Sequence, residues 1–371
     1  MKFTCEQVNL TKALNIVSKA VSSRTTIPTL KGILMEVKDD NKLLLTASDM
    51  DLTIETSIEV ENAEKGSIVV PAKLFNEVIR KMPHDYINIS TDGFNININC
   101  LTSNSSIIGS DADEFPFIKN NEETTEEIIF NRNTFSNMIK KTSFAASIDQ
   151  TKGAITGVLV ELLKEEMKMV AIDGFRMAVT TENIESEKEE SIIISARIMD
   201  EINKIITEND RNNDSEIKIV IDKKNATVYL DNTKISTRLI AGDFVKYREI
   251  IPKEFNTEIT LNKKYLSEAI ERVSILSEGK NNLIKMSIKD NVMTITSKSE
   301  EGGAMEDILI HKDGDDLDIG FNSRFLLNIM RVIEDEEIKM QFNTSLSPCM
   351  IKPLDGSAYE YLILPVRISN M

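Results

Sequence analysis

The segment Val70-Pro-Ala-Lys73-Leu74-Phe-Asn-Glu-Val78 has a residue pattern that returns twice further along the chain. The later copies are Ile194-Ser-Ala-Arg197-Ile198-Met-Asp-Glu-Ile202 and Phe321-Asn-Ser-Arg324-Phe325-Leu-Leu-Asn-Ile329. Apolar residues hold the first, fifth and ninth places, and a basic residue holds the fourth. A Pro, Ser or Asn at the second place supplies a helix start. Such self-similarity indicates an architecture of repeats.

A second amphipathic pattern repeats with nearly the same period. Its three copies keep one internal spacing: Phe3, Leu10, Leu14, Val17, Ala20; Ile128, Phe135, Ile139, Thr142, Ala145; Ile259, Leu266, Ile270, Val273, Leu276. The i, i+4, i+7 stripe is typical of a helix that packs on one side. The copies are offset by 125 and 131 residues, and those of the first pattern by 124 and 127, so chance is a poor explanation.

Alternating apolar runs broken by turn residues lie between these helices. Residues 33–37 and 43–46 predict one hairpin, and residues 217–221 and 227–230 predict another. We therefore predict an α+β fold with three repeated domains, 1–126, 127–256 and 257–371, each with two helices on antiparallel sheets. Acidic stretches at 122–127 and 182–190 are interpreted as a linker and a solvated loop.

Composition excludes several classes of protein. The 371 residues are 41% hydrophobic and 28% charged, which is ordinary for folded domains. No apolar run approaches the roughly 20 residues of a membrane span, and the first residues lack a secretory stretch, so we expect the cytoplasm. Three distant cysteines and two histidines favour neither disulfides nor a metal site. We expect no cofactor and no metal.

Positive charge is concentrated in the predicted helices although the chain carries a net charge of −16. The six helical stretches 9–20, 73–82, 132–142, 196–206, 262–273 and 323–333 hold 15 Lys and Arg against five acidic residues. One basic helix is usually just a solvated face. Six together favour a surface that meets phosphates, with an acidic body that discourages binding elsewhere. The absence of Trp favours contact with a duplex backbone over stacking on single-stranded bases.

The chain resembles the bacterial DNA sliding clamp family, the beta subunit of DNA polymerase III, over its whole length. The resemblance is carried by Met1-Lys2-Phe3-Thr4, Arg24-Thr-Thr-Ile-Pro-Thr-Leu-Lys-Gly32, Asp173-Gly174-Phe175-Arg176-Met177-Ala178 and Leu364-Pro365-Val366-Arg367-Ile368. It implies a non-catalytic processivity factor: a head-to-tail homodimeric ring around duplex DNA, with twelve helices lining the hole. A ring that holds DNA by topology needs only a mildly basic lining, so net acidity is no objection.

The resemblance also implies three groups of site residues. DNA-contacting residues are Arg24, Lys73, Gln150, Arg197 and Arg324. A pocket for short peptides of the polymerase, the clamp loader and repair proteins comprises Ile155, Ile172, Gly174, Phe175, Arg176, Met177, Val245, Ile250, Leu346, Leu362, Leu364, Pro365, Val366, Arg367 and Ile368. The dimer interface involves Ile107, Ile275 and Leu276. Taken alone, Asp173-Gly174 is typical of a hairpin turn, and Leu362, Leu364 and Val366 alternate like an ordinary core strand.

The chain departs from the family pattern at three places. Val245 replaces a common proline, Glu249 stands where some relatives carry arginine, and Ser369-Asn370-Met371 extend past the usual end. These departures affect the expected peptide preference.

The sequence leaves two other functions to consider, an enzyme and a protein-binding scaffold. An enzyme could use paired carboxylates such as Asp49 with Asp51 or Asp111 with Asp113. However, the acidic cluster at 313–318 does not fit the calcium-loop pattern, and no P-loop, GxSxG or HExxH motif occurs, so no catalytic residue is predicted. A repeat scaffold that binds proteins without encircling DNA is the other alternative.

Overall fold

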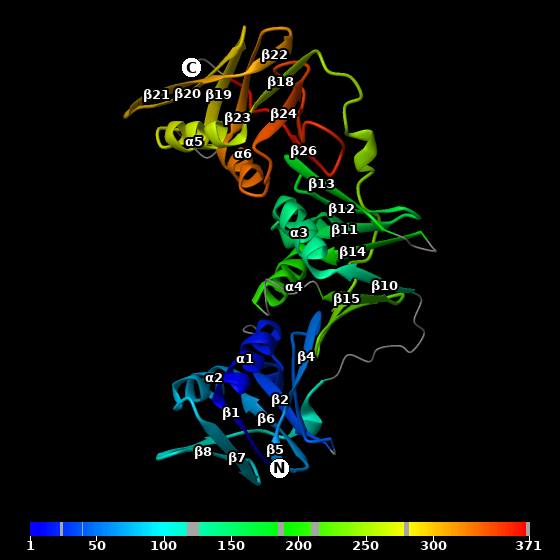
Figure 1. Cartoon of the computed structure of the whole chain (residues 1–371), viewed down its shortest axis with the longest axis vertical. Coiled ribbons are helices and arrows are strands. Elements are labelled where there is room, and N and C mark those ends of the chain that lie inside the picture. The colour runs from blue at the N-terminus through cyan, green and yellow to red at the C-terminus, as the bar shows by residue number, and fades with distance from the viewer. Residues whose placement is uncertain are drawn as a thin grey trace. The chain divides into compact units, whose positions relative to one another are not determined.

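The computed structural model describes residues 1–22, 25–38, 40–116, 126–184, 189–208, 215–277 and 282–368. The chain forms two compact units (Figure 1). Unit 1 comprises Met1–Asn133 with Lys204–Leu239, and unit 2 comprises Thr134–Asn203 with Ile240–Met371.

The two repeated patterns form the six α-helices of the described residues. The first pattern gives α2 (Ala72–Lys81), α4 (Ala196–Glu208) and α6 (Ser323–Met330). The second gives α1 (Gln7–Val17), α3 (Arg132–Thr142) and α5 (Lys263–Ser274). Local chemistry sets their starts: the Asn262 Oδ1 accepts hydrogen bonds from the Lys264 and Tyr265 amides, and the Asn322 Oδ1 accepts one from Arg324. The predicted helices are confirmed.

Unit 1 contains two antiparallel sheets. The five-stranded sheet has the order β5 (Glu61–Glu64), β1 (Lys2–Glu6), β7 (Tyr86–Asp92), β8 (Asn95–Cys100), β9 (Ser103–Ile108). The eight-stranded sheet has the order β10 (Glu126–Asn131), β15 (Glu216–Ile221), β16 (Asn225–Leu230), β17 (Thr233–Arg238), β4 (Leu52–Glu59), β3 (Lys42–Ser48), β2 (Gly32–Val37), β6 (Gly66–Pro71). Pairing of β17 with β4 therefore joins strands of two sequence repeats into one sheet.

Unit 2 repeats this arrangement. The nine-stranded sheet has the order β14 (Glu190–Ser195), β11 (Gly157–Leu162), β12 (Glu166–Ile172), β13 (Arg176–Asn183), β26 (Tyr359–Ile363), β25 (Cys349–Lys352), β24 (Glu337–Phe342), β18 (Thr257–Asn262), β22 (His311–Gly314). The four-stranded sheet has the order β21 (Gly302–Leu309), β20 (Val292–Ser299), β19 (Leu283–Lys289), β23 (Leu317–Asn322). Here β13 and β26 join two repeats.

The core follows the repeated apolar stripe. All residues of that stripe are buried except Leu276, which is partly exposed, so the stripe faces the sheets in every copy. Both predicted hairpins are confirmed, as β2 with β3 and β15 with β16. Within each unit the helices lie on one side of the strands (Figure 1). No helix of the described ranges is long and apolar enough to cross a membrane.

The predicted α+β class, with paired helices on antiparallel sheets, is therefore observed. The domain boundaries at 126 and 256 stay a prediction.

Candidate functional site

The junction of β13 and β26 brings the two ends of the predicted peptide pocket together. Met177 is the register partner of Leu362, and both are buried, with 1% and 2% of their surface exposed. They belong, with Ile172, to an apolar cluster that also contains Leu159, Val170, Val179, Ile193, Tyr247 and Met350. These three predicted residues therefore form an apolar floor below the surface.

Five other predicted residues are large, apolar and exposed. Phe175 is 57% exposed, Leu346 64%, Val245 and Ile250 40% each, and Leu364 37%. The Leu364 amide donates to the Phe175 carbonyl at 2.8 Å, which places these two side by side. Val245 and Ile250 flank Tyr247, a member of the apolar cluster. Phe175, Val245, Ile250 and Leu364 thus adjoin residues of the buried cluster, and exposed apolar side chains beside an apolar floor are typical of a binding surface.

Ile155 and the C-terminal residues of the predicted pocket lie in two different places. Ile155 is partly exposed and follows Ala154, which packs against the apolar cluster. The tail after β26 lies instead against β23: the Val366 amide donates to the Gly320 carbonyl at 2.8 Å. A side chain at position 320 would meet Val366 and Ile368, so glycine permits this approach. Pro365 is partly exposed and Arg367 is exposed.

The turn before β13 is held by one carboxylate. Asp173 Oδ1 accepts hydrogen bonds from the backbone amides of Phe175 at 2.8 Å and Arg176 at 3.0 Å. Gly174 adopts φ +97°, and nothing lies near the place of a side chain there, so the backbone conformation rather than space requires glycine. The Asp173-Gly174 turn thus presents Phe175 outward just before the start of β13.

Arg176 is fixed from several sides. Its Nε donates to Asp173 Oδ2 at 3.0 Å, and its Nη2 donates to the Phe144 carbonyl at 2.7 Å. Burial lowers the pKa of the guanidinium, and the Asp173 carboxylate opposes that shift. Its Nη1 is buried and has no hydrogen-bond partner among the described residues.

Two aromatic residues of this site were missed by the sequence analysis. The Arg176 guanidinium lies 4.6 Å from the ring centroid of Phe325 and 5.3 Å from that of Phe144. The Phe175 and Phe325 rings stack at 6.3 Å. Phe325 did carry a signal, since it is the aromatic residue at a repeated helix position where the other copies have Leu74 and Ile198.

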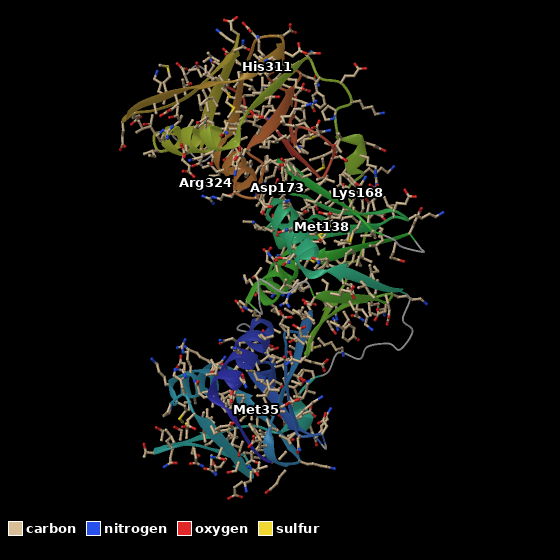
Figure 2. All side chains as sticks on the ribbon, viewed as in Figure 1. Met35, Met138, Lys168, Asp173, His311 and Arg324 are labelled. Carbon is tan, nitrogen blue, oxygen red and sulfur yellow. The ribbon has the colours of Figure 1, made fainter. Side chains whose placement is uncertain are left out.

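Three of the predicted DNA-contacting residues occupy equivalent positions. Lys73, Arg197 and Arg324 are each the second residue of their helix, and all three are exposed. Arg324 lies at the start of α6 on the helical side of unit 2 (Figure 2). A cation in the first turn opposes the helix dipole, at a cost of about 0.3–1 kcal/mol. Helix stability therefore does not explain the repeated charge.

Of the other two predicted DNA-contacting residues, the structure describes Gln150 but not Arg24. Gln150 is exposed at the start of the 3₁₀ helix Gln150–Thr156. Asp149, the residue before it, accepts hydrogen bonds from the amide and hydroxyl of Thr151. These bonds lower the pKa of the Asp149 carboxyl group. Arg24 lies outside the described residues.

Not all of the 15 Lys and Arg residues in the six helical stretches contribute free positive charge to the surface. Arg132 is only 1% exposed: its guanidinium donates to the Ile206 carbonyl and pairs with Asp231, whose own side chain is about half exposed. Lys19, Lys140 and Arg272 form ion pairs with Glu208, Glu334 and Glu306. Within the described residues, the exposed helical cations without an ion pair include Lys12, Lys73, Arg80, Lys81, Arg324 and Arg331.

The predicted interface residues lie near two open sheet edges. Ile107 is only 5% exposed, because antiparallel pairing of β9 with β8 turns it into the core, whereas its neighbour Ile108 is 73% exposed. Phe94, whose carbonyl accepts from the Gly109 amide, is 55% exposed beside it. In unit 2, Ile275 is 79% exposed and Leu276 partly exposed, and the edge strand β21 exposes Met305 and Leu309.

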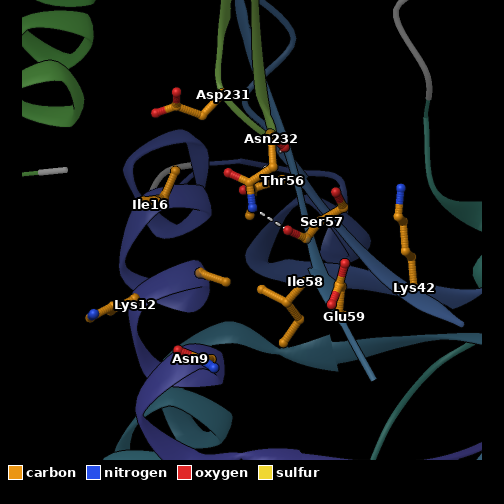
Figure 3. Close-up of a pocket in the computed structure, with 11 residues that line it drawn as sticks. Asn9, Lys12, Ile16, Lys42, Thr56, Ser57, Ile58, Glu59, Asp231 and Asn232 are labelled. Carbon is orange, nitrogen blue, oxygen red and sulfur yellow. Dashed lines mark hydrogen bonds between the residues drawn. The ribbon is translucent and has the colours of Figure 1, made fainter. Parts of the chain in front are cut away.

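A separate hollow of about 560 Å³ lies in unit 1, between α1, the strands β3 and β4, and the turn after β16 (Figure 3). The side-chain amide Nδ2 of Asn232 donates to the Ser57 carbonyl across it. Its lining balances Lys12 and Lys42 with Glu59 and Asp231, so it offers no net charge to a ligand.

The repeated helix pairs on antiparallel sheets, with a basic residue at each equivalent helix start, define a clamp-type repeat protein. Models of the DNA polymerase III beta subunit match the chain in order: the N-terminal domain at residues 1–119, the central domain at 130–246 and the C-terminal domain at 248–367.

Relatives that match over the whole chain point to the same family as these three models. The chain is 30% identical to the beta sliding clamp of a Synechocystis species, covering all of both chains. A solved putative DNA polymerase III beta subunit from Eubacterium rectale is 33% identical, with a TM-score of 0.94 over 99% of this chain and 100% of that one. The Bacillus subtilis DNA polymerase sliding clamp is 31% identical with a TM-score of 0.93 over both whole chains.

The chain therefore belongs to the bacterial beta sliding clamp family. Its function is that of a processivity factor of DNA polymerase III, and it is a non-catalytic subunit.

Proposed function

We propose that two copies of the chain close head to tail into a ring around duplex DNA, and that the β13–β26 surface tethers the replicative polymerase. The observation that supports the ring is a pair of open sheet edges with exposed apolar side chains, β9 with Ile108 and β21 with Met305 and Leu309. Joining one edge to the other on a second copy is a heterologous contact, which forms a closed dimer when the rotation fits. Such pairing also covers edges that would otherwise invite aggregation.

DNA contact in this proposal is electrostatic and weak. Lys73, Arg197 and Arg324 are exposed at helix starts, where flexible side chains reach phosphates without reading bases. The chain's net charge of −16 discourages binding to DNA elsewhere on the surface. The duplex is then retained by the closed ring and slides through it. DNA and a polymerase are the partners that this function requires.

The β13–β26 surface has the chemistry of a peptide site. The exposed side chains of Phe175, Val245, Ile250, Leu346 and Leu364 offer apolar contacts around the floor formed by Met177 and Leu362. Short apolar segments of the polymerase, the clamp loader and repair proteins are the proposed occupants, and they compete for this one surface.

Retention on circular DNA tests the ring. After loading on a closed circle the protein should remain bound through gel filtration, and linearising the circle should release it. Equal retention on cut and closed circles would contradict encirclement. Absence of retention on both would favour the alternative of a protein-binding scaffold.

The apolar edge residues are tested by substitution. Ile275→Asp combined with Leu276→Asp, or Ile108→Asp alone, should yield monomers, because each places a charge in the proposed interface. The measurement is molar mass by light scattering during dilution. Ile148→Asp is the control, since Ile148 is 97% exposed and lies on neither edge. A dimer mass that persists in the edge variants counts against this interface.

The peptide surface is tested with Leu364→Glu. A charge among apolar contacts should weaken binding of a peptide copied from the organism's own replicative polymerase by about 10- to 100-fold while the dimer stays intact. Calorimetry measures the affinity. Leu354→Glu is a matched control, since Leu354 and Leu364 are both 37% exposed. Met177→Glu should act in the same direction from the floor. Unchanged affinity in Leu364→Glu would refute the assignment.

The basic helix starts are tested by reversing charge. Changing Lys73, Arg197 and Arg324 to Glu together should reduce loading onto DNA. The difference in loading between this variant and the wild type should become smaller as the salt concentration rises, because salt screens the charges of both proteins. Reversing Lys38, Lys289 and Lys298, exposed lysines outside the helices, makes the same change in net charge. Equal defects in both triple variants would show that only net charge matters.

A further inference from the structure

The segment between β17 and β18 carries two residues of the proposed peptide surface, Val245 and Ile250, yet no strand pairing among the described residues holds it. Its central residue, Tyr247, is only 4% exposed, and its ring belongs to the apolar cluster with Met177 and Leu362. The Tyr247 hydroxyl donates to Glu161 Oε2 in β11 at 2.6 Å. One aromatic side chain therefore ties this segment both to the floor and to the sheet.

Arg248 completes the attachment. Its Nη1 donates to Glu161 Oε1 at 3.0 Å, and its Nη2 donates to Glu161 Oε2 at 2.8 Å, which is a bidentate pair. The guanidinium also lies 4.7 Å from the Tyr247 ring centroid. Both oxygens of the Glu161 carboxylate are thus used. The Glu161 side chain is 14% exposed and the Arg248 side chain 56%, so the carboxylate is sheltered while the guanidinium meets solvent.

The backbone transmits this attachment to the two surface residues. The Tyr247 amide donates to the Val245 carbonyl at 2.7 Å, a tight turn that fixes the direction of Val245. The Ile250 amide donates to the Tyr247 carbonyl at 3.0 Å and closes the 3₁₀ helix Tyr247–Glu249. The positions of Val245 and Ile250 therefore follow from that of Tyr247. Burial, followed by the Glu161 hydrogen bond, raises the pKa of the Tyr247 hydroxyl, so it stays a donor at neutral pH.

The geometry points to Glu161 as a positioning residue for peptide binding: through Tyr247 and Arg248 it holds Val245 and Ile250 in the arrangement that a peptide meets. This inference rests on the proposed peptide surface. Glu161 itself acts from β11 through its two partners. The segment is ordered before the peptide arrives, so binding does not have to order it.

Breaking the attachment should reduce the fraction of molecules in which Val245 and Ile250 are placed to bind the peptide. If breaking the attachment leaves the segment correctly placed for only a fraction of the time, the apparent affinity falls by that fraction. For Arg248→Met we expect about a five- to tenfold rise in the peptide Kd. Because only the fraction of molecules able to bind changes, the loss should appear in the association rate constant, with the dissociation rate constant unchanged. Glu161→Gln should act in the same direction, because the amide keeps an acceptor for Tyr247 but loses the charge pair.

The experiment uses the full-length protein and a fluorescent peptide copied from its replicative polymerase. Stopped-flow fluorescence gives both rate constants, and trypsin cleavage after Lys246, followed by mass spectrometry, reports on the segment itself. Cleavage should be faster in both variants and slow again at saturating peptide. The double variant should bind no more weakly than the weaker single one, because both substitutions break the same attachment.

Lys218→Met provides a matched control. Lys218 pairs with Glu127 at 3.0 Å and lies 5.1 Å from the Tyr229 ring centroid in unit 1, so it shares the chemistry of Arg248 without its position. Its peptide binding should equal that of the wild type.

Four results decide the matter. Slower association with faster Lys246 cleavage in both variants supports the inference. Wild-type peptide affinity in both variants overturns it. Weaker binding with a lower melting temperature but unchanged cleavage also overturns it, because that is a general loss of stability. A wild-type protein that binds no peptide overturns the proposed surface itself, a result distinct from the other three.

Discussion

Backbone pairing between β13 and β26 is the constraint on which the proposed peptide surface depends. Its register opposes Met177 to Leu362, so both side chains enter the same apolar cluster. The pairing continues past β26 as the hydrogen bond from Leu364 to Phe175, which leaves those two side chains exposed. Because side chains alternate along a strand, a slip by one residue would exchange floor and surface. The floor and its exposed border are therefore one consequence of a single register.

The same pairing explains how distant parts of the chain make one site. Asp173 shapes the turn before β13, and Arg176 then reaches across to the ring of Phe325 in α6. Neither part of the chain could present this surface alone. The part around β13 supplies Phe175 and the turn, and the C-terminal part supplies Leu364 after β26 and Phe325 in α6. Because β13 and β26 belong to one sheet, backbone hydrogen bonds fix the position of one relative to the other, and such pairing is stiffer than a contact between loops.

Much of the fold could be predicted from the sequence, because apolar spacing alone determines which helix face is buried. Residues that depend on distant partners could not. Ile107 and Ile108 are adjacent apolar residues, and only the pairing of β9 with β8 decides which one is exposed. The sequence suggests that Arg132 is a surface cation, yet its side chain is buried and bound by the Ile206 carbonyl and Asp231. The sharing of sheets between repeats, through β4 with β17 and β13 with β26, is likewise invisible in local pattern.

Of the site, the turn and the floor follow from motifs, whereas the role of the connecting segment does not. Residue 245 is a valine and lacks the fixed φ that proline would give, so rigidity there must come from other contacts. Ordering a loose segment on binding would cost about 1–2 kcal/mol per residue. Tyr247 and Arg248 provide an alternative, since one carboxylate on a rigid strand binds both of them. A polar attachment at the margin of an apolar surface keeps that surface free for a partner. It also fixes the outline that the partner must fit.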